Sequence, residues 1–310
     1  MPEWLYEEGI GENRAILAED GAILEAAIEL PGLRAGSIIE AKLASMAGIA
    51  LLDDGSEATV SPLPAVTEGA RFHAEVVREA IPEPGRPKPP KLKPSDLPLC
   101  EGPSLRERTG GSPGSGPDLF EAAGWSELLE EAARGEIGFE GGALRMSLTP
   151  AMTLFDVDGQ LPPQALAEAG AAAAAKAIRR FGIAGSIGID LPTLPKDRRQ
   201  AAAAAVDAIL PQPFERTAVN GFGFLQIVRR RERPSLPEIL QADPAGAAAR
   251  ALLRRAGRLT GAVTLHAAPA VIHRLTEEWR AALARRTGGP VSLRAEPGLA
   301  ISSGHAEQSH

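Results

Sequence analysis

The chain has 310 residues with a net charge of −7, and its 44% hydrophobic and 24% charged content is ordinary for a globular protein of two or three modest domains. The acidic balance argues against a non-specific nucleic-acid coat, which is normally strongly basic, but leaves room for an enzyme with a local basic patch. A single cysteine, Cys100, excludes an internal disulfide framework and a multi-cysteine zinc site within one chain. No signal-peptide pattern and no run of about 18 apolar residues occurs, so we expect a cytoplasmic chain with no membrane partner.

Short strands separated by turn signals fill the first third of the chain. Alternating apolar residues over 1–35, with the turn signal EDG at 19–21, predict a β-hairpin. Further short strands over 36–95 predict a small barrel. Residues 96–120 are rich in proline and glycine, which is typical of a linker, and we expect 110–117 to be mobile.

The middle of the chain alternates between helices and strands. A helix is predicted over 125–134 with Ser126 as its cap, and strands then lead to the acidic segment LFDVDG at 154–159. An alanine-rich helix at 165–181 and a strand SIGID at 186–190 follow, so the three elements form a βαβ unit with parallel, neighbouring strands. Because side chains alternate along a strand, Asp156 and Asp158 share a face. We expect them to converge with Asp190, which ends the neighbouring strand.

Elements downstream complete this region and add a smaller unit. The pattern predicts a helix at 197–210, a strand at 221–231, a helix at 246–256, a strand at 262–267, a helix at 269–286 and a strand at 290–295. Residues 301–310 have the composition of a disordered tail.

Carboxylates at adjacent strand ends suit a hard divalent cation with oxygen ligands. Mg²⁺ fits best because it often takes one or two protein carboxylates and keeps waters and substrate phosphates as its other ligands. Such a metal polarises a phosphoryl oxygen and helps to form the attacking water. The alternative interpretation is that Asp156 and Asp190 only cap turns at the ends of their strands.

Three segments around these acids resemble the ribonuclease E/ribonuclease G family of bacterial endoribonucleases. LFDVDG (154–159) is similar to the family's aspartate-x-asparagine strand motif, and IAGSIGIDL (183–191) is similar to its glycine-rich strand that ends in aspartates. GFLQIVRRRERPSL (223–236) resembles the family segment in which an arginine cluster precedes P-S-L. The resemblance spans most of 1–300, with its specific motifs within 150–237.

The resemblance implies a mixed α/β (α+β) fold with a ribonuclease H-like catalytic domain. Its N-terminal strands would lie in 1–35 and its catalytic core in 121–237, and 36–95 would be an OB-fold RNA-binding insert. A linker at 96–120 and a small C-terminal α/β domain at 238–300 complete this organisation. By position, the resemblance assigns Asp156 and Asp190 to Mg²⁺, with Mn²⁺ as an alternative metal, and gives Asp158 an orienting or auxiliary role.

Basic and aromatic side chains are the candidate RNA contacts. Arg229 and Arg231 share one face of a strand, while Lys196 and Arg198 follow the Asp190 strand. Each could meet a phosphate, and the alternatives are solvent or the sheet's own acids. Within the insert, Phe72 is the aromatic residue nearest the expected RNA surface, where stacking is worth about 1–3 kcal/mol per base.

Several departures from the family pattern distinguish this chain. Asp158 stands where the family has asparagine, and Thr193 stands where it has a second aspartate. No C-P-x-C motif follows P-S-L, so we expect no zinc-linked dimer. The segment between insert and core is too short for a full sensor domain for RNA 5′ ends.

Three functional hypotheses follow. The first is a Mg²⁺-dependent endoribonuclease that hydrolyses single-stranded RNA to 5′-phosphate and 3′-hydroxyl ends. The second is an RNA-binding or ribosome-associated module with weak or no catalysis. It is favoured by the insert's lack of the family's usual stacking aromatics apart from Phe72 (DDGSEATV at 53–60 has none), by the missing zinc link and by Asp158. The retention of Asp156 and Asp190 opposes it. The third is a protein-interaction scaffold, which has only the acidic composition in its favour.

Overall fold

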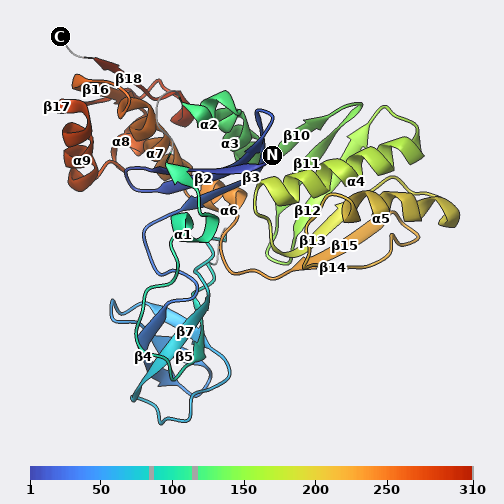
Figure 1. The fold of residues 1–310 in the computed structure, drawn as a ribbon, viewed down its shortest axis with the longest axis horizontal. Coiled ribbons are helices and arrows are strands. Elements are labelled where there is room, and N and C mark those ends of the chain that lie inside the picture. Colours follow the sequence, from blue (N-terminus) through green and yellow to red (C-terminus); the bar gives the residue numbers. More distant parts are fainter. Residues whose placement is uncertain (84–86, 114–117, 309–310) are drawn as a thin grey trace.

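The computed structural model describes residues 1–83, 87–113 and 118–308, which form a mixed α and β protein with three open sheets and a closed barrel (Figure 1). The barrel projects from the body of the molecule, the largest sheet and its two covering helices lie on one side, and the C-terminal unit lies on the other. No helix within these described ranges has the length and apolar character needed to cross a membrane.

The N-terminal sheet has the order β3-β2-β1-β9, formed by β1 (Glu3–Glu8), β2 (Asn13–Glu19), β3 (Ala22–Glu29) and β9 (Ser112–Pro113). Asp20 and Gly21 have φ angles of 51° and 78°, which confirms the predicted hairpin turn at 19–21.

The segment predicted as a linker, 96–120, contains regular structure. It includes α1 (Leu105–Thr109), whose first turn is closed by a capping box between Ser104 and Glu107, and the start of α2 (Leu119–Ala122). It also includes β9, which pairs in parallel with β1. Within the segment expected to be mobile, 110–117, residues 112–113 form β9, and residues 114–117 lie outside the described residues.

The small barrel predicted over 36–95 is confirmed. Its strand order is β4 (Ile38–Ser45), β5 (Ile49–Leu51), β6 (Glu57–Val60), β8 (Lys91–Pro94) and β7 (Arg71–Arg78), and it is closed. Small and branched side chains fill it, among them the fully buried Leu43, Ala50 and Leu92. A barrel this narrow has room for few rings in its core, which agrees with the low aromatic content of the chain.

The largest sheet has six strands in the order β10-β11-β12-β13-β15-β14. Their bounds are β10 (Glu136–Phe139), β11 (Gly142–Leu148), β12 (Thr153–Gly159), β13 (Gly185–Asp190), β15 (Phe224–Arg229) and β14 (Glu215–Arg216). Helix α4 (Pro163–Arg180) connects β12 to the parallel neighbour β13, which confirms the predicted βαβ unit. The helix ends where expected, because Gly182 takes a left-handed φ of 66°.

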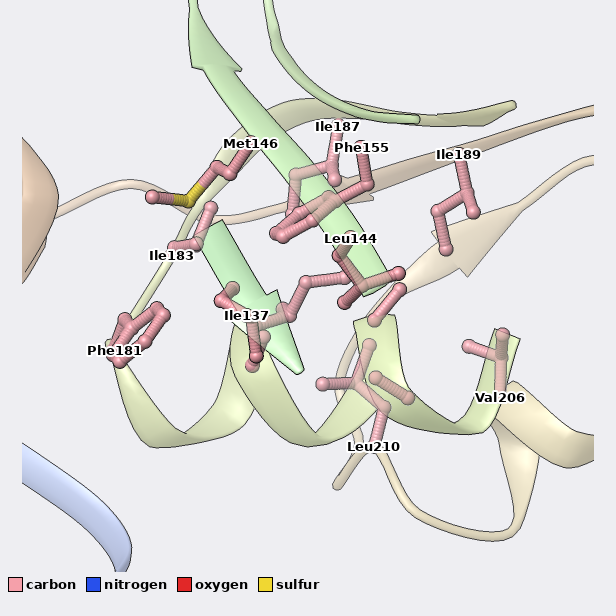
Figure 2. Packing of buried hydrophobic residues seen from close by; sticks show 14 of the residues in the cluster. Ile137, Leu144, Met146, Phe155, Phe181, Ile183, Ile187, Ile189, Val206 and Leu210 are labelled. Atoms are coloured by element: carbon pink, nitrogen blue, oxygen red, sulfur yellow. The ribbon is translucent and has the colours of Figure 1, made fainter. Parts of the chain in front are cut away.

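One face of this sheet carries the main core, shown in Figure 2. Phe155, Ile187 and Ile189 of the sheet are fully buried there, together with Val206 of α5 (Arg199–Asp207). A stripe of buried alanines and Gly170 lets α4 approach closely, since a Cβ on Gly170 would lie 2.3 Å from Val157 Cγ1. Side chains on the opposite face of β12 therefore point away from this core.

Helices α3 (Trp125–Arg134) and α6 (Leu236–Ala242) pack against each other, and α6 also contacts β3 of the N-terminal sheet. The predicted helix at 125–134 is confirmed, but its N-cap is Gly124, with a φ of 90°, rather than Ser126, so that prediction is wrong. The reason is that the helix begins at Trp125, whose ring is fully buried at an edge-to-face contact with Phe120.

The C-terminal unit has the sheet order β17-β16-β18. It contains α7 (Pro244–Ala256), β16 (Gly261–Ala267), α8 (Pro269–Ile272), α9 (Glu277–Thr287), β17 (Gly288–Ala295) and β18 (His305–Gln308). The helix expected at 269–286 is broken into α8 and α9, because Thr276 caps α9 by accepting a hydrogen bond from the Trp279 N–H. The prediction of a disordered tail is wrong for 301–308, since a short 3₁₀ turn (Ile301–Ser303) precedes β18 and β18 pairs antiparallel with β16.

Candidate active site

Two of the three predicted acids lie side by side. Asp156 of β12 is paired in register with Asp190 of β13, so both side chains project from the same face of the sheet, opposite the core. Cα atoms of such neighbours are about 4.8 Å apart. Both side chains are exposed, and within the described residues neither carboxylate has a hydrogen-bonding or ion-pair partner. Two unpaired acids therefore share one small area of sheet surface.

Asp158 is on the same strand face but further along. The pairing between β12 and β13 ends at Asp156 and Asp190, so Asp158 has a partner only on β11, where it faces Ala143. Two residues of strand separate it from Asp156 by about 6.6 Å. In the parts of the chain that the structure describes, no group of three or more His, Cys, Asp or Glu residues is arranged to hold a metal ion. The structure thus brings Asp156 and Asp190 together and leaves Asp158 apart.

Two side chains that the sequence analysis did not single out flank the acids. Arg145 of β11 faces Asp156, and Phe224 of β15 faces Asp190. The four residues Arg145, Asp156, Asp190 and Phe224 thus follow one another across four strands, and we call them the cross-strand row. Arg145 is exposed and forms no ion pair within the described ranges. Alternation within LRMSL places Arg145 on a polar face, but only the register of β11 places it opposite Asp156.

The surface next to Phe224, at one end of the cross-strand row, is apolar. A Cβ on Gly188 would lie 2.4 Å from Phe224 Cζ and 2.8 Å from Leu154 Cδ2, so these two side chains lie over the bare backbone of this glycine. Gly188 precedes Asp190 by two residues and therefore lies on the same face. The two acids therefore lie between the guanidinium group of Arg145 on one side and the apolar surface of Phe224 and Leu154 on the other.

A tight turn places another aromatic ring beyond the end of the row. The Asn220 side-chain oxygen accepts hydrogen bonds from the N–H groups of Phe222 (2.9 Å) and Phe224 (3.0 Å). Thr193, just after the Asp190 strand, donates its hydroxyl to the Phe222 carbonyl at 3.3 Å. Phe222 itself is 84% exposed. Nothing in the sequence singles out Phe222, since the family resemblance implies RNA-stacking aromatics in the barrel.

The predicted phosphate contacts Lys196 and Arg198 lie at this same end of the sheet. Both are exposed in the 3₁₀ turn (Lys196–Arg198) that follows β13. Arg198 donates to the Gln164 side chain at the start of α4 (2.8 Å) and lies 3.3 Å from Asp197. Lys196 has no partner among the described residues and remains available to an anion.

Arg229 and Arg231 lie elsewhere. Arg229 faces Gly185 at the other end of β15, five residues or about 17 Å from Phe224. It donates to the Ile183 carbonyl at 2.8 Å, and burial lowers its pKa against the opposing influence of Glu25. Arg231 donates to Glu83 at 2.8 Å and to Glu238, so two carboxylates occupy its guanidinium group. Neither arginine is placed beside the acids.

Phe72, the predicted stacking residue of the barrel, is half-buried. It faces Ala41 across β4 and β7 and packs against the barrel core. The structure therefore presents no freely exposed ring at this position.

The donor set of Asp156 and Asp190 fits a hydrated divalent cation such as Mg²⁺, which needs only one or two protein carboxylates. Searches against protein-family models and against curated proteins find no match for the chain.

Proposed function

We propose that the chain is a Mg²⁺-dependent endoribonuclease that hydrolyses phosphodiester bonds of single-stranded RNA in the cytoplasm. The observation that carries the proposal is the register of Asp156 and Asp190, which places two exposed, unpaired carboxylates directly opposite each other. Like charges in this arrangement repel and destabilise a sheet. A cation from outside the chain would offset that repulsion, and Mg²⁺ or Mn²⁺ suits the two oxygen donors.

The residues around the acids are suited to phosphodiester hydrolysis. Asp156 and Asp190 would hold the cation, which when bound supplies Lewis-acid activation of a phosphoryl oxygen and of a water molecule. Arg145, one strand from Asp156, would offset negative charge that develops on the phosphate. Lys196 and Arg198 would hold neighbouring phosphates of the strand. Water oxygen bonds to phosphorus as the bond from phosphorus to the 3′ oxygen breaks, which leaves a 5′-phosphate and a 3′-hydroxyl.

The order of the structural units supports the resemblance to the ribonuclease E/ribonuclease G family. A closed five-stranded barrel occupies the place expected for the OB-fold insert, and the βαβ unit links the two aspartate motifs. On this proposal the barrel binds RNA, and the sheets of 1–35 and 121–237 form the ribonuclease H-like catalytic part. The family's zinc-linked dimer is not expected, for want of its cysteine motif.

A second candidate is an RNA-binding or ribosome-associated module without useful catalysis. It is favoured by the position of Asp158, which lies outside the paired region of β12 and β13, and by the half-buried state of Phe72.

Cleavage of a 5′-labelled, AU-rich single-stranded RNA in Mg²⁺, Mn²⁺ or EDTA tests the proposal. The Asp156→Asn/Asp190→Asn double variant keeps the shape of both side chains and should cut at least about a hundredfold more slowly, since even a supporting residue of a metal site can contribute that much. Asp197→Asn is the matched control, an exposed carboxylate in the turn after β13. RNA retention on a filter without cutting would favour the second candidate, and failure to bind RNA would exclude both.

A further inference from the structure

Phe222 has an unusual environment for its side-chain type. The residue is 84% exposed, and every other Phe, Trp or Tyr within the described residues is buried or half-buried. Burying a phenylalanine ring contributes about 1.5–3 kcal/mol to folding stability. The other aromatic residues supply such a contribution and Phe222 does not. A single exposed apolar residue needs no explanation by itself, and the inference depends on where and how this ring is held.

The turn that carries Phe222 is well defined by hydrogen bonds. In addition to the two N–H groups bonded to the Asn220 side chain, the Gly223 carbonyl accepts from the Leu191 N–H at 3.2 Å. Gly223 has a φ of 92°, and a Cβ there would lie 2.1 Å from the Leu191 carbonyl oxygen. The Thr193 hydroxyl binds the Phe222 carbonyl from the other side. The backbone of Phe222 is thus tied to the segment that leaves Asp190, and its ring is presented to solvent.

This position is next to the candidate metal ligands. Phe222 precedes Phe224 by two residues, and Phe224 is in register with Asp190. Lys196 and Arg198 lie in the turn after β13, so acids, cations and an exposed ring occupy one end of the sheet. A ring beside phosphate-binding groups matches single-stranded nucleic acid, in which phosphates alternate with unpaired bases whose faces stack on aromatic side chains.

We propose that Phe222 is a base-stacking residue that holds an unpaired base of the RNA next to the bond cut at Asp156 and Asp190. The inference rests on the proposed function for its substrate class. It implies a requirement for an unstacked base at that position, so a double helix, whose bases are stacked on one another, is excluded there. A stacking platform tolerates all four bases, so little preference for base identity is expected.

The test uses the full chain with a single-stranded RNA that contains one 2-aminopurine, whose fluorescence is quenched on stacking. Binding is measured in the Asp156→Asn/Asp190→Asn background, so that the RNA stays intact, with the probe moved along the strand. Phe222→Ala should weaken binding about tenfold and abolish the quench at one probe position. Phe222→Tyr should keep the RNA affinity and the fluorescence quench of the unmodified residue. Phe222→Leu, which is apolar but has no aromatic ring, should resemble Phe222→Ala in both measurements. Ile301→Ala, at an exposed apolar residue of the C-terminal unit, is the matched control.

Each outcome separates this inference from the nuclease proposal. Phe222-dependent quenching by a chain that cuts no RNA would uphold the stacking role and reject the nuclease. Asp-dependent cutting with RNA affinity unchanged in Phe222→Ala would uphold the nuclease and overturn the stacking role. Rescue by leucine as complete as rescue by tyrosine would also overturn it. A change of oligomeric state in Phe222→Ala, with RNA affinity unaltered, would also overturn the stacking role, because the ring would then contact a second copy of the chain.

Discussion

Asp156 of β12 faces Asp190 of β13 in register, and both carboxylates are exposed and without a partner in the described chain. Neighbouring positions in a sheet usually combine apolar side chains or opposite charges, because like charges directly opposite each other are destabilising. The pair therefore costs stability in the free protein. On the proposed function, a bound cation would offset the repulsion between the two carboxylates and return that stability.

Asn at position 156 should therefore stabilise the metal-free protein. Asp156→Asn removes the repulsion with Asp190 and should raise the free energy of unfolding by about 0.2–1 kcal/mol in EDTA. Mg²⁺ should raise the melting temperature of the unmodified chain but not of the variant, because a ligand stabilises only the state that binds it. Denaturant and thermal unfolding with and without Mg²⁺ measure both effects. Asp158→Asn is the control and should change less, since Asp158 faces no acid; an equal gain from both variants would argue against the pair.

Arg231 should be a structural residue. Arg231→Ala leaves Glu238, which is 7% exposed, without its cation and should cost about 3 kcal/mol of unfolding free energy. Arg230→Ala is the matched control, since its pair with Glu232 (3.1 Å) is exposed and worth less than about 1 kcal/mol. RNA affinity of folded Arg231→Ala should stay within about twofold, because its guanidinium is already bound by carboxylates. A large loss of RNA affinity at unchanged stability would reverse this assignment.

Glu12 should attach the N-terminal sheet to the C-terminal unit. Its buried carboxylate accepts from Arg250 Nε at 2.9 Å and from Arg254, both on α7. Glu12→Gln leaves the buried Arg250 and the part-buried Arg254 without a counter-charge and should cost about 3–5 kcal/mol. Denaturant unfolding measures the loss, and Glu277→Gln is the control, since Glu277 lies in an exposed pair with Arg280. Equal stability of the two variants would contradict the role given to Glu12.

The C-terminal strand should be sensitive to pH through His266. The buried ring bonds Glu296 at 2.5 Å and Glu307 of β18 at 3.0 Å, and the bond to Glu296 is the main cause of its raised pKa. A raised pKa contributes stability that is fully present below about pH 6.5, the ordinary value, and is lost as the pH rises through the pKa of the folded state. The same bond lowers the pKa of Glu296, whose contribution is lost in acid.

Melting temperatures at pH 6 and pH 8 check this effect. The unmodified chain should lose stability between these pH values more steeply than His266→Gln, which keeps a polar side chain that does not titrate. Protection factors of the β18 amides, which correct for the rise of intrinsic hydrogen exchange with pH, should fall over the same interval. Parallel pH profiles for the two proteins would show that His266 does not contribute.

Local patterns were enough to predict much of the architecture. The EDG turn, the alanine-rich helix at 165–181 and the strand on each side of it follow from propensity and alternation, and a short crossover requires parallel neighbours. Those same rules place Asp156 and Asp190 on adjacent strands. They failed at 301–308, where a polar composition suggested disorder, because pairing with β16 and the contact from Glu307 to His266 come from a distant segment.

What the sequence by itself determined is the pair of carboxylates and the elements that carry them. Only the tertiary structure decided their surroundings: Arg145 beside Asp156, Phe224 beside Asp190, Arg231 bound by two glutamates and Phe222 presented by its turn. The physical reason is that alternation and propensity act within a segment, whereas strand register and side-chain pairing depend on which segments meet. A slip of one residue would move every side chain of β11 to the other face and remove Arg145 from the row.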